Sequence, residues 1–182
     1  MQITDKIRVS NVFFNIVSVS IGVYGTLAEM QGKHWTIMQN CNRLSCATGA
    51  IYFIYDTYVE GVIYKRITFI PHHLISLIFV YKFLTLSDIP MIRMGPILLL
   101  CGEGSSLLVN LREILKDKKQ LTTKRDIAVL ILYFILRNGI ITPIVYNNRK
   151  NNTEVWYGWI AIFLMSNYWC YMWTKSILKH VK

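Results

Sequence analysis

The stretch Asp126–Asn147, DIAVLILYFILRNGIITPIVYN, is a nearly continuous run of apolar side chains. A helix of about 20 apolar residues is long enough to cross the hydrocarbon core of a bilayer. Asp126 and Arg137 are the only acidic or basic residues in this stretch. It therefore predicts a transmembrane helix, in which Pro143 is expected to introduce a kink.

The rest of the chain has the composition of a membrane protein. Of its 182 residues, 53% are hydrophobic and 16% are charged, whereas a soluble domain carries about 25% charged residues. Six apolar stretches follow one another, at residues 10–30, 44–63, 68–86, 91–110, 126–147 and 155–175. The sequence therefore predicts an all-α, polytopic bundle of about six transmembrane helices. It would form one membrane domain over residues 10–180, preceded by a short polar segment at residues 1–9.

The basic residues are distributed unevenly between the two sides of this predicted bundle. Thirteen lie on the side of the termini, namely Lys6, Arg8, Lys65, Arg66, Arg112, Lys116, Lys118, Lys119, Lys124, Arg125, Lys175, Lys179 and Lys182. Five lie on the other side, namely Lys33, Arg43, Arg93, Arg149 and Lys150. Because cytosolic loops carry the excess of Lys and Arg, both termini are expected in the cytosol.

The same pattern bounds the classes of partner and modification. The net charge of +10 does not indicate a nucleic-acid partner, because the basic residues lie between apolar stretches and no nucleic-acid-binding motif accompanies them. The few histidines and scattered cysteines do not form a recognisable metal-binding set, so no metal or resident cofactor is expected. The sequon Asn151-Asn152-Thr153 falls in the last non-cytosolic loop, which makes Asn151 a candidate glycosylation site.

Polar side chains occur inside five of the predicted spans. They are Asp56, His72, His73, Glu103, Arg137 and Asn167. At about 1.5 Å per helical residue, they fall at comparable depths in the half of the membrane nearer the termini. Ionisable groups are costly inside a bilayer and usually mark a lipid, ion or proton site. These residues are therefore expected to meet at a lipid site whose cavity opens toward the cytosolic leaflet.

Two of these features predict specific contacts. Arg137 is expected to pair with Asp56 or Glu103, because a charge at this depth needs a partner. Ser106 and Asn110 follow Glu103 at i+3 and i+7 and extend its polar stripe along one helix face. The alternative for both is structural: the charges would only hold the bundle together, and Ser106 and Asn110 would only bond between helices.

The histidine pair His72-His73 follows Pro71 at the start of the third span. Adjacent helical residues point about 100° apart, so the two imidazoles are not expected to serve one site from the same face. A single histidine oriented by a carboxylate is sufficient for a catalytic base or an acyl acceptor. A non-catalytic alternative is that the pair lies at the membrane interface.

Four motifs in order resemble the TLC-domain family. Residues 49–56, GAIYFIYD, resemble its "GYF-x-x-D" helix, and Pro71-His72-His73 resembles its paired histidines. Residues 103–112, EGSSLLVNLR, are similar to its "E-x-S-x-x-x-x-N-x-R" helix, and Asn167-Tyr168-Trp169 with Lys175 is similar to its last helix. The resemblance covers about residues 10–180. The family includes ceramide synthases, translocation-associated membrane proteins, the ceroid-lipofuscinosis protein of the endoplasmic reticulum and a group of small TLC-domain proteins.

The resemblance implies a lipid-related role in the endoplasmic reticulum or a related internal membrane. In ceramide synthases the paired histidines are required for acyl transfer from acyl-CoA. Their following helix carries a His-Asp and further aspartates, whereas this chain has Glu103-Gly104-Ser105-Ser106. That departure favours the small TLC-domain group, distantly related to ceramide synthases, many of whose members adjust phospholipid composition.

Three hypotheses follow. The first is a protein that handles membrane lipids through binding, synthesis or control of membrane composition. In the second it is an acyltransferase with acyl-CoA as co-substrate; His72 or His73 is the base or acyl acceptor, and Asp56 or Glu103 orients the imidazole. Ser106, Asn110, Arg112, Arg137 and Asn167 are then candidates for binding lipid or acyl-CoA, with Arg112 and nearby lysines at the phosphates. The third is a non-catalytic cargo receptor or scaffold.

Overall fold

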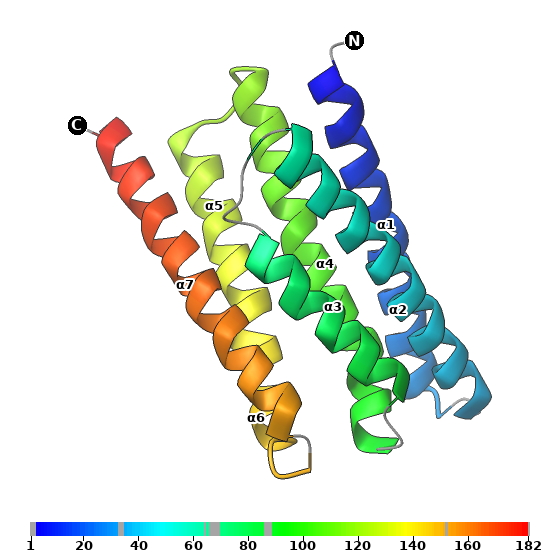
Figure 1. Cartoon of the computed structure of the whole chain (residues 1–182). Helices are drawn as coiled ribbons and strands as arrows, with labels where there is room; N and C mark the ends of the chain where they lie inside the picture. The colour runs from blue at the N-terminus through cyan, green and yellow to red at the C-terminus, as the bar shows by residue number, and fades with distance from the viewer. Residues whose placement is uncertain are drawn as a thin grey trace.

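A computed structural model describes residues 3–32, 35–63, 65, 70–85, 89–151 and 153–181. Successive helical rods run up and down along a common direction, and both chain ends lie at the same end of the bundle (Figure 1). This end is called the terminal end below, and the other the loop end. The predicted all-α bundle of six spans is confirmed.

Over the ranges that the structure describes, the six rods contain α-helices and two π-helical segments. The α-helices are α1 (Ile3–Met30), α2 (Trp35–Tyr58), α3 (Ile70–Thr85), α4 (Ile89–Asp117), α5 (Thr123–Phe134), α6 (Thr142–Asn147) and α7 (Thr153–Val181). The π-helical segment η1 (Val59–Ile63) continues α2, and η3 (Ile135–Ile141) joins α5 to α6 just before Pro143. Within the described residues, three stretches are long and apolar enough to cross a membrane, namely Ser10–Met30, Arg93–Asp117 and Thr123–Asn147.

Some helices extend beyond the predicted spans. The span predicted at residues 10–30 is confirmed as Ser10–Met30, within a helix that begins at Ile3, whereas the second helix begins at Trp35 rather than at residue 44. The fourth helix continues to Asp117, past the predicted end of its span at residue 110, so residues 118–122 alone connect it to α5. The reason is visible in α2, where Asn42 is only 5% exposed. Hydropathy assigns such a residue to a loop, but here its polar side chain is covered by neighbouring helices.

Small residues let α1 approach α4 closely. A Cβ atom built on Gly22 would lie 2.8 Å from the backbone nitrogen of Leu100, and one built on Gly25 would lie 2.7 Å from the ring of Pro96. Such glycine contacts are typical of packed membrane helices, where backbone proximity replaces the hydrophobic effect. Besides α1, α4 packs against α2, α5 and η3, which makes it the central helix of the bundle.

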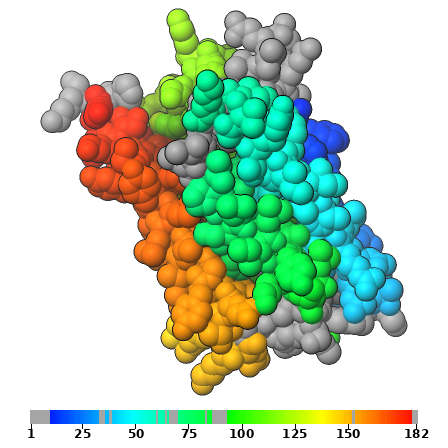
Figure 2. All heavy atoms as spheres, in the orientation of Figure 1, coloured from blue at the N-terminus to red at the C-terminus, as the bar shows by residue number. Residues whose placement is uncertain are grey.

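The outer surface is apolar. Large hydrophobic side chains such as Phe13, Ile54, Ile78 and Leu164 are about 60% exposed on the outer faces of four helices. Figure 2 shows part of this surface from the side of α3, which packs between α2 and α7. Apolar side chains on the outside and polar ones inside fit a bundle whose solvent is lipid.

Candidate functional site

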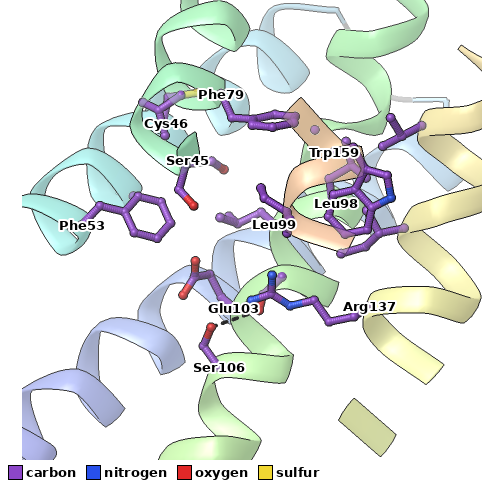
Figure 3. A pocket seen from close by; sticks show the side chains of 18 of the residues that line it. Ser45, Cys46, Phe53, Phe79, Leu98, Leu99, Glu103, Ser106, Arg137 and Trp159 are labelled. Carbon is purple, nitrogen blue, oxygen red and sulfur yellow. Dashed lines mark hydrogen bonds between the residues drawn. The ribbon is translucent and has the colours of Figure 1, made fainter. Parts of the chain in front are cut away.

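A cavity of about 160 Å³, partly open to its surroundings, lies between the helices and is lined by α2, α3, α4, η3, α6 and α7 (Figure 3). Most of its wall is apolar and includes Phe53, Phe79, Leu98, Leu99 and Trp159. Its polar lining residues are Asn42, Ser45, His72, Ser76, Glu103, Ser106 and Arg137. An apolar cavity with a few convergent polar groups is the usual form of a small-molecule site.

The cavity extends along the helices from a charged end to an apolar end. On α4 its lining runs from Ser106 back to Gly95, which is roughly 16 Å at 1.5 Å per residue. Glu103 lies near the Ser106 end, whereas Gly95 and Val145 lie close to the loop end of their helices. The cavity therefore extends from the charged groups toward the loop end.

Glu103 reaches the cavity from α4 and is held from behind by α1. The Nδ2 of Asn15 donates a hydrogen bond of 2.7 Å to Glu103 Oε2, and Asn110 Nδ2 donates one of 2.7 Å to Asn15 Oδ1. Asn15 is completely buried. Among the described residues, Glu103 Oε1 accepts no hydrogen bond. One oxygen of this carboxylate is thus fixed, and the other is left for whatever occupies the cavity.

Arg137 lies on the π-helical segment η3 and is 7% exposed. Its Nε donates a hydrogen bond of 2.6 Å to Ser105 Oγ, and its guanidinium lies 5.8 Å from the centre of the Tyr133 ring. The predicted pairing with Asp56 or Glu103 is wrong: in the described part of the chain, Arg137 forms no ion pair with either carboxylate. Figure 3 shows its guanidinium and the Glu103 carboxylate turned toward the same space.

The two histidines have different surroundings. His73 is 3% exposed; its Nε2 lies 3.1 Å from Asp56 Oδ2, and its Nδ1 lies 3.2 Å from Thr57 Oγ1. Asn11 Nδ2 donates a hydrogen bond of 3.0 Å to the other oxygen of Asp56. His72 instead lines the cavity and packs edge-on against Trp169, at 5.3 Å between ring centres. His72 therefore lines the cavity and His73 does not, although their ring centres are 5.6 Å apart, and the carboxylate beside His73 is that of Asp56.

Asp56, the histidine pair and Glu103 lie on α2, α3 and α4, which contain three of the four sequence motifs described above. A family model for the TLC domain, which covers the TRAM, LAG1 and CLN8 proteins, matches residues 6–179. The chain belongs to the TLC-domain family. It is therefore a multi-pass integral membrane protein. No curated protein matches it, and neither does any solved structure.

Four of the residues predicted for the site line the cavity of this TLC domain, namely His72, Glu103, Ser106 and Arg137. Asp56, His73 and Asn110 are connected to the buried polar groups around it but do not line it. Asn167 also lies outside the lining; it accepts a hydrogen bond from Asn138 Nδ2 and donates one to the Phe163 carbonyl. Asn151 is exposed at the loop end, in the turn before α7.

Arg112 lies apart from the cavity, in an ion pair that joins α4 to α5. Its Nε and Nη2 donate to the two oxygens of Asp126, at 2.6 and 3.1 Å, and its Nη1 donates to Glu113. Its guanidinium lies 4.4 Å from the ring centre of Trp173, whose Nε1 also donates to Asp126. These contacts connect α4, α5 and α7 near the terminal end, and they occupy the donors expected to face a phosphate.

Sequence reasoning missed the contribution of α1. Asn11, Asn15 and Ser18 are 8%, 0% and 1% exposed, and the two asparagines donate to Asp56 and Glu103. A signal was present, because these residues follow one another at i, i+4 and i+7 and so share one helix face. Asparagine is polar but not ionisable, so these residues did not mark a candidate site in an apolar helix as the carboxylates did.

Proposed function

We propose that this TLC-domain protein binds a membrane lipid in the cavity and acts in lipid handling, through lipid binding, lipid synthesis or control of membrane lipid composition. The observation that carries the proposal is the apolar cavity that ends on His72, Glu103 and Arg137. Lipid is the solvent around the bundle, and an apolar wall with a few polar groups at one end suits a ligand that has an apolar tail and a polar head. The membrane proposed is the endoplasmic reticulum or a related internal membrane, with the terminal end in the cytosol, which the excess of basic residues at that end supports.

A purely structural role for the buried charges accounts less well for the cavity. Charges that only fix packing are expected to be fully paired, as Arg112 and Asp126 are. Glu103 and Arg137 instead each use one atom for packing and leave the others toward the cavity. That contrast favours lipid handling over a cargo receptor or scaffold.

The test compares lipids that co-purify with the wild type and with two kinds of variant, measured by mass spectrometry. Gly102→Leu is designed to fill the cavity: Gly102 lines it, and a Cβ atom built there meets nothing within 4 Å. His72→Ala combined with His73→Ala removes the imidazoles. Leu164→Ala, on the outer face of α7, is the matched control because its side chain is 62% exposed.

A defined lipid species in the wild type and the control, lost from folded Gly102→Leu protein, is the expected result. If the wild type carries only the lipids of the surrounding membrane in their bulk proportions, the proposed function is wrong. Unchanged lipids together with the loss of a protein partner would favour the scaffold.

A second candidate is acyl transfer from acyl-CoA, favoured by the position of His72 beside an Asp56–His73 pair. A nitrogen of His72 would attack the thioester carbonyl carbon, and the bond between that carbon and the CoA sulfur would break. The CoA thiolate would then take up the proton of the acylated imidazolium and leave as the free thiol. An amine or hydroxyl acceptor would then take the acyl group, and its proton would return to the imidazole. In this reading His72 is the reacting residue and His73 a positioning residue.

Turnover of acyl-CoA by purified protein tests this second candidate over a panel of amine and lysolipid acceptors. His72→Ala is expected to abolish turnover, whereas Asp56→Asn should reduce it about 100-fold or less through loss of orientation. No turnover by the wild type across the panel rejects the enzyme, and retention of a bound lipid would leave the first proposal standing.

A further inference from the structure

We propose that the cavity selects a single-chain lipid whose head group has no net charge and carries a hydrogen-bond acceptor beside a donor, as a monoacylglycerol does. This inference rests on the proposed lipid-binding function and names the chemistry of the head group. It starts from two opposite charges that line one cavity without bonding each other, Glu103 and Arg137.

Both charges are fixed from behind. Asn15 donates to Glu103 Oε2, and Ser105 Oγ accepts from Arg137 Nε, each within 2.7 Å. Asn15 and Ser105 are both 0% exposed, so these contacts lie in packed protein. The two charged groups are therefore held at separate positions on α4 and η3, rather than free to swing together into a direct pair.

Each charge keeps unused bonding capacity on the cavity side. Glu103 Oε1 accepts no hydrogen bond, and the two terminal nitrogens of Arg137 donate none, within the described ranges. The neighbouring His72 has an Nδ1 with no hydrogen-bond partner in the same part of the chain. Because leaving buried charged groups unbonded is costly, an occupant that bonds both at once is favoured.

The two charges restrict what that occupant is. A carboxylate head would bond Arg137 but bring a second negative charge to Glu103, and an ammonium head would bond Glu103 but repel Arg137. An oxygen acceptor for Arg137 with a hydroxyl donor for Glu103 satisfies both and adds no net charge. From this charged end the apolar wall continues past Leu98 and Phe79 toward the loop end, so it receives the part of the acyl chain next to the head group, and the rest of the chain leaves through the open side of the cavity.

The experiment measures displacement of tritiated monopalmitoylglycerol from the full-length protein in phosphatidylcholine nanodiscs. The competitors have similar chain length and are compared at equal mole fraction in the nanodisc: monopalmitoylglycerol itself, palmitic acid, hexadecylamine and methyl palmitate. For the wild type, monopalmitoylglycerol is expected to compete at least about tenfold better than the fatty acid or the amine, because each of those leaves one buried charge facing a like charge.

Two charge-removing variants test the cause of this preference. In Glu103→Gln, palmitic acid should gain about tenfold relative to monopalmitoylglycerol, and in Arg137→Gln hexadecylamine should gain by a similar factor. Leu98→Phe is the matched control in the apolar wall, where all competitors should weaken by the same factor. Should a charge variant fail to fold, the wild-type order alone still decides.

A wild type that binds palmitic acid or hexadecylamine as well as monopalmitoylglycerol overturns this inference and leaves the lipid-binding proposal intact. The same follows if both charge variants keep the wild-type order. If the wild type does not bind tritiated monopalmitoylglycerol specifically, the inference is overturned. If, in addition, no defined lipid co-purifies with the wild type, the proposed function is overturned as well.

Discussion

Replacing glycine by alanine is expected to have opposite effects at two positions of this bundle, Gly22 and Gly102. At Gly22 the new methyl group would lie 2.8 Å from the backbone nitrogen of Leu100 and 2.9 Å from its Cα. Backbone atoms in a packed helix cannot move aside as a side chain can. The helices α1 and α4 must separate, and overpacking of this kind costs about 1–3 kcal/mol.

At Gly102 the same methyl group meets nothing within 4 Å, because it enters the cavity. Alanine also stabilises a helix interior over glycine by about 0.5–1 kcal/mol, since glycine loses more backbone entropy on folding. Gly102→Ala should therefore be neutral to slightly stabilising, and the two variants should differ by about 1–4 kcal/mol in the free energy of unfolding.

The assay is thermal unfolding of the purified protein in one detergent, followed by circular dichroism or by loss of the monodisperse peak after heating. For a chain of this length, about 2–4 °C in Tm corresponds to each kcal/mol, so Gly22→Ala should melt roughly 2–12 °C below the wild type. Gly102→Ala should melt at the wild-type temperature or slightly above it. A Gly22→Ala protein that melts with the wild type, or a Gly102→Ala protein that melts well below it, would refute the packing described for α1, α4 and the cavity.

Three further predictions concern buried polar groups and topology. Asn15→Leu should destabilise by about 1–3 kcal/mol, because it leaves Glu103 without its donor; adding Glu103→Leu should cost less than the sum of the single variants in the same thermal assay. Arg112→Ala should cost about 3–5 kcal/mol by leaving the buried Asp126 unpaired, whereas Arg112→Met with Asp126→Leu should be closer to neutral in denaturant unfolding. A reporter fused to the C-terminus should be accessible from the cytosol, and a glycan removed by Asn151→Gln should be detected by a gel shift. A reporter protected from the cytosol would reverse the orientation of the whole bundle.

The family and the helical architecture follow from local features of the sequence. The length of an apolar stretch such as 126–147 is sufficient to predict a membrane-spanning helix, because the bilayer imposes both thickness and internal hydrogen bonding. The helical rise of about 1.5 Å per residue, which gives the length of each span, also places Asp56 and Glu103 at comparable depths in the membrane. The sequence therefore determined the all-α bundle, the terminal end shared by both chain ends and most of the residues that belong to one buried polar region.

The partner of each buried polar group was decided only by the tertiary structure. Asp56 bonds His73 and Asn11, Glu103 bonds Asn15, and Arg137 bonds Ser105, whereas charge alone predicted an ion pair. These choices depend on how each helix is rotated about its axis and how closely it approaches its neighbour. Contacts between segments far apart in the chain set both, as Gly22 against Leu100 illustrates. Local periodicity specifies which face of a helix is polar, but it does not determine which other helix that face will contact. The cavity and the unbonded atoms of its charged side chains are therefore formed only when the helices pack.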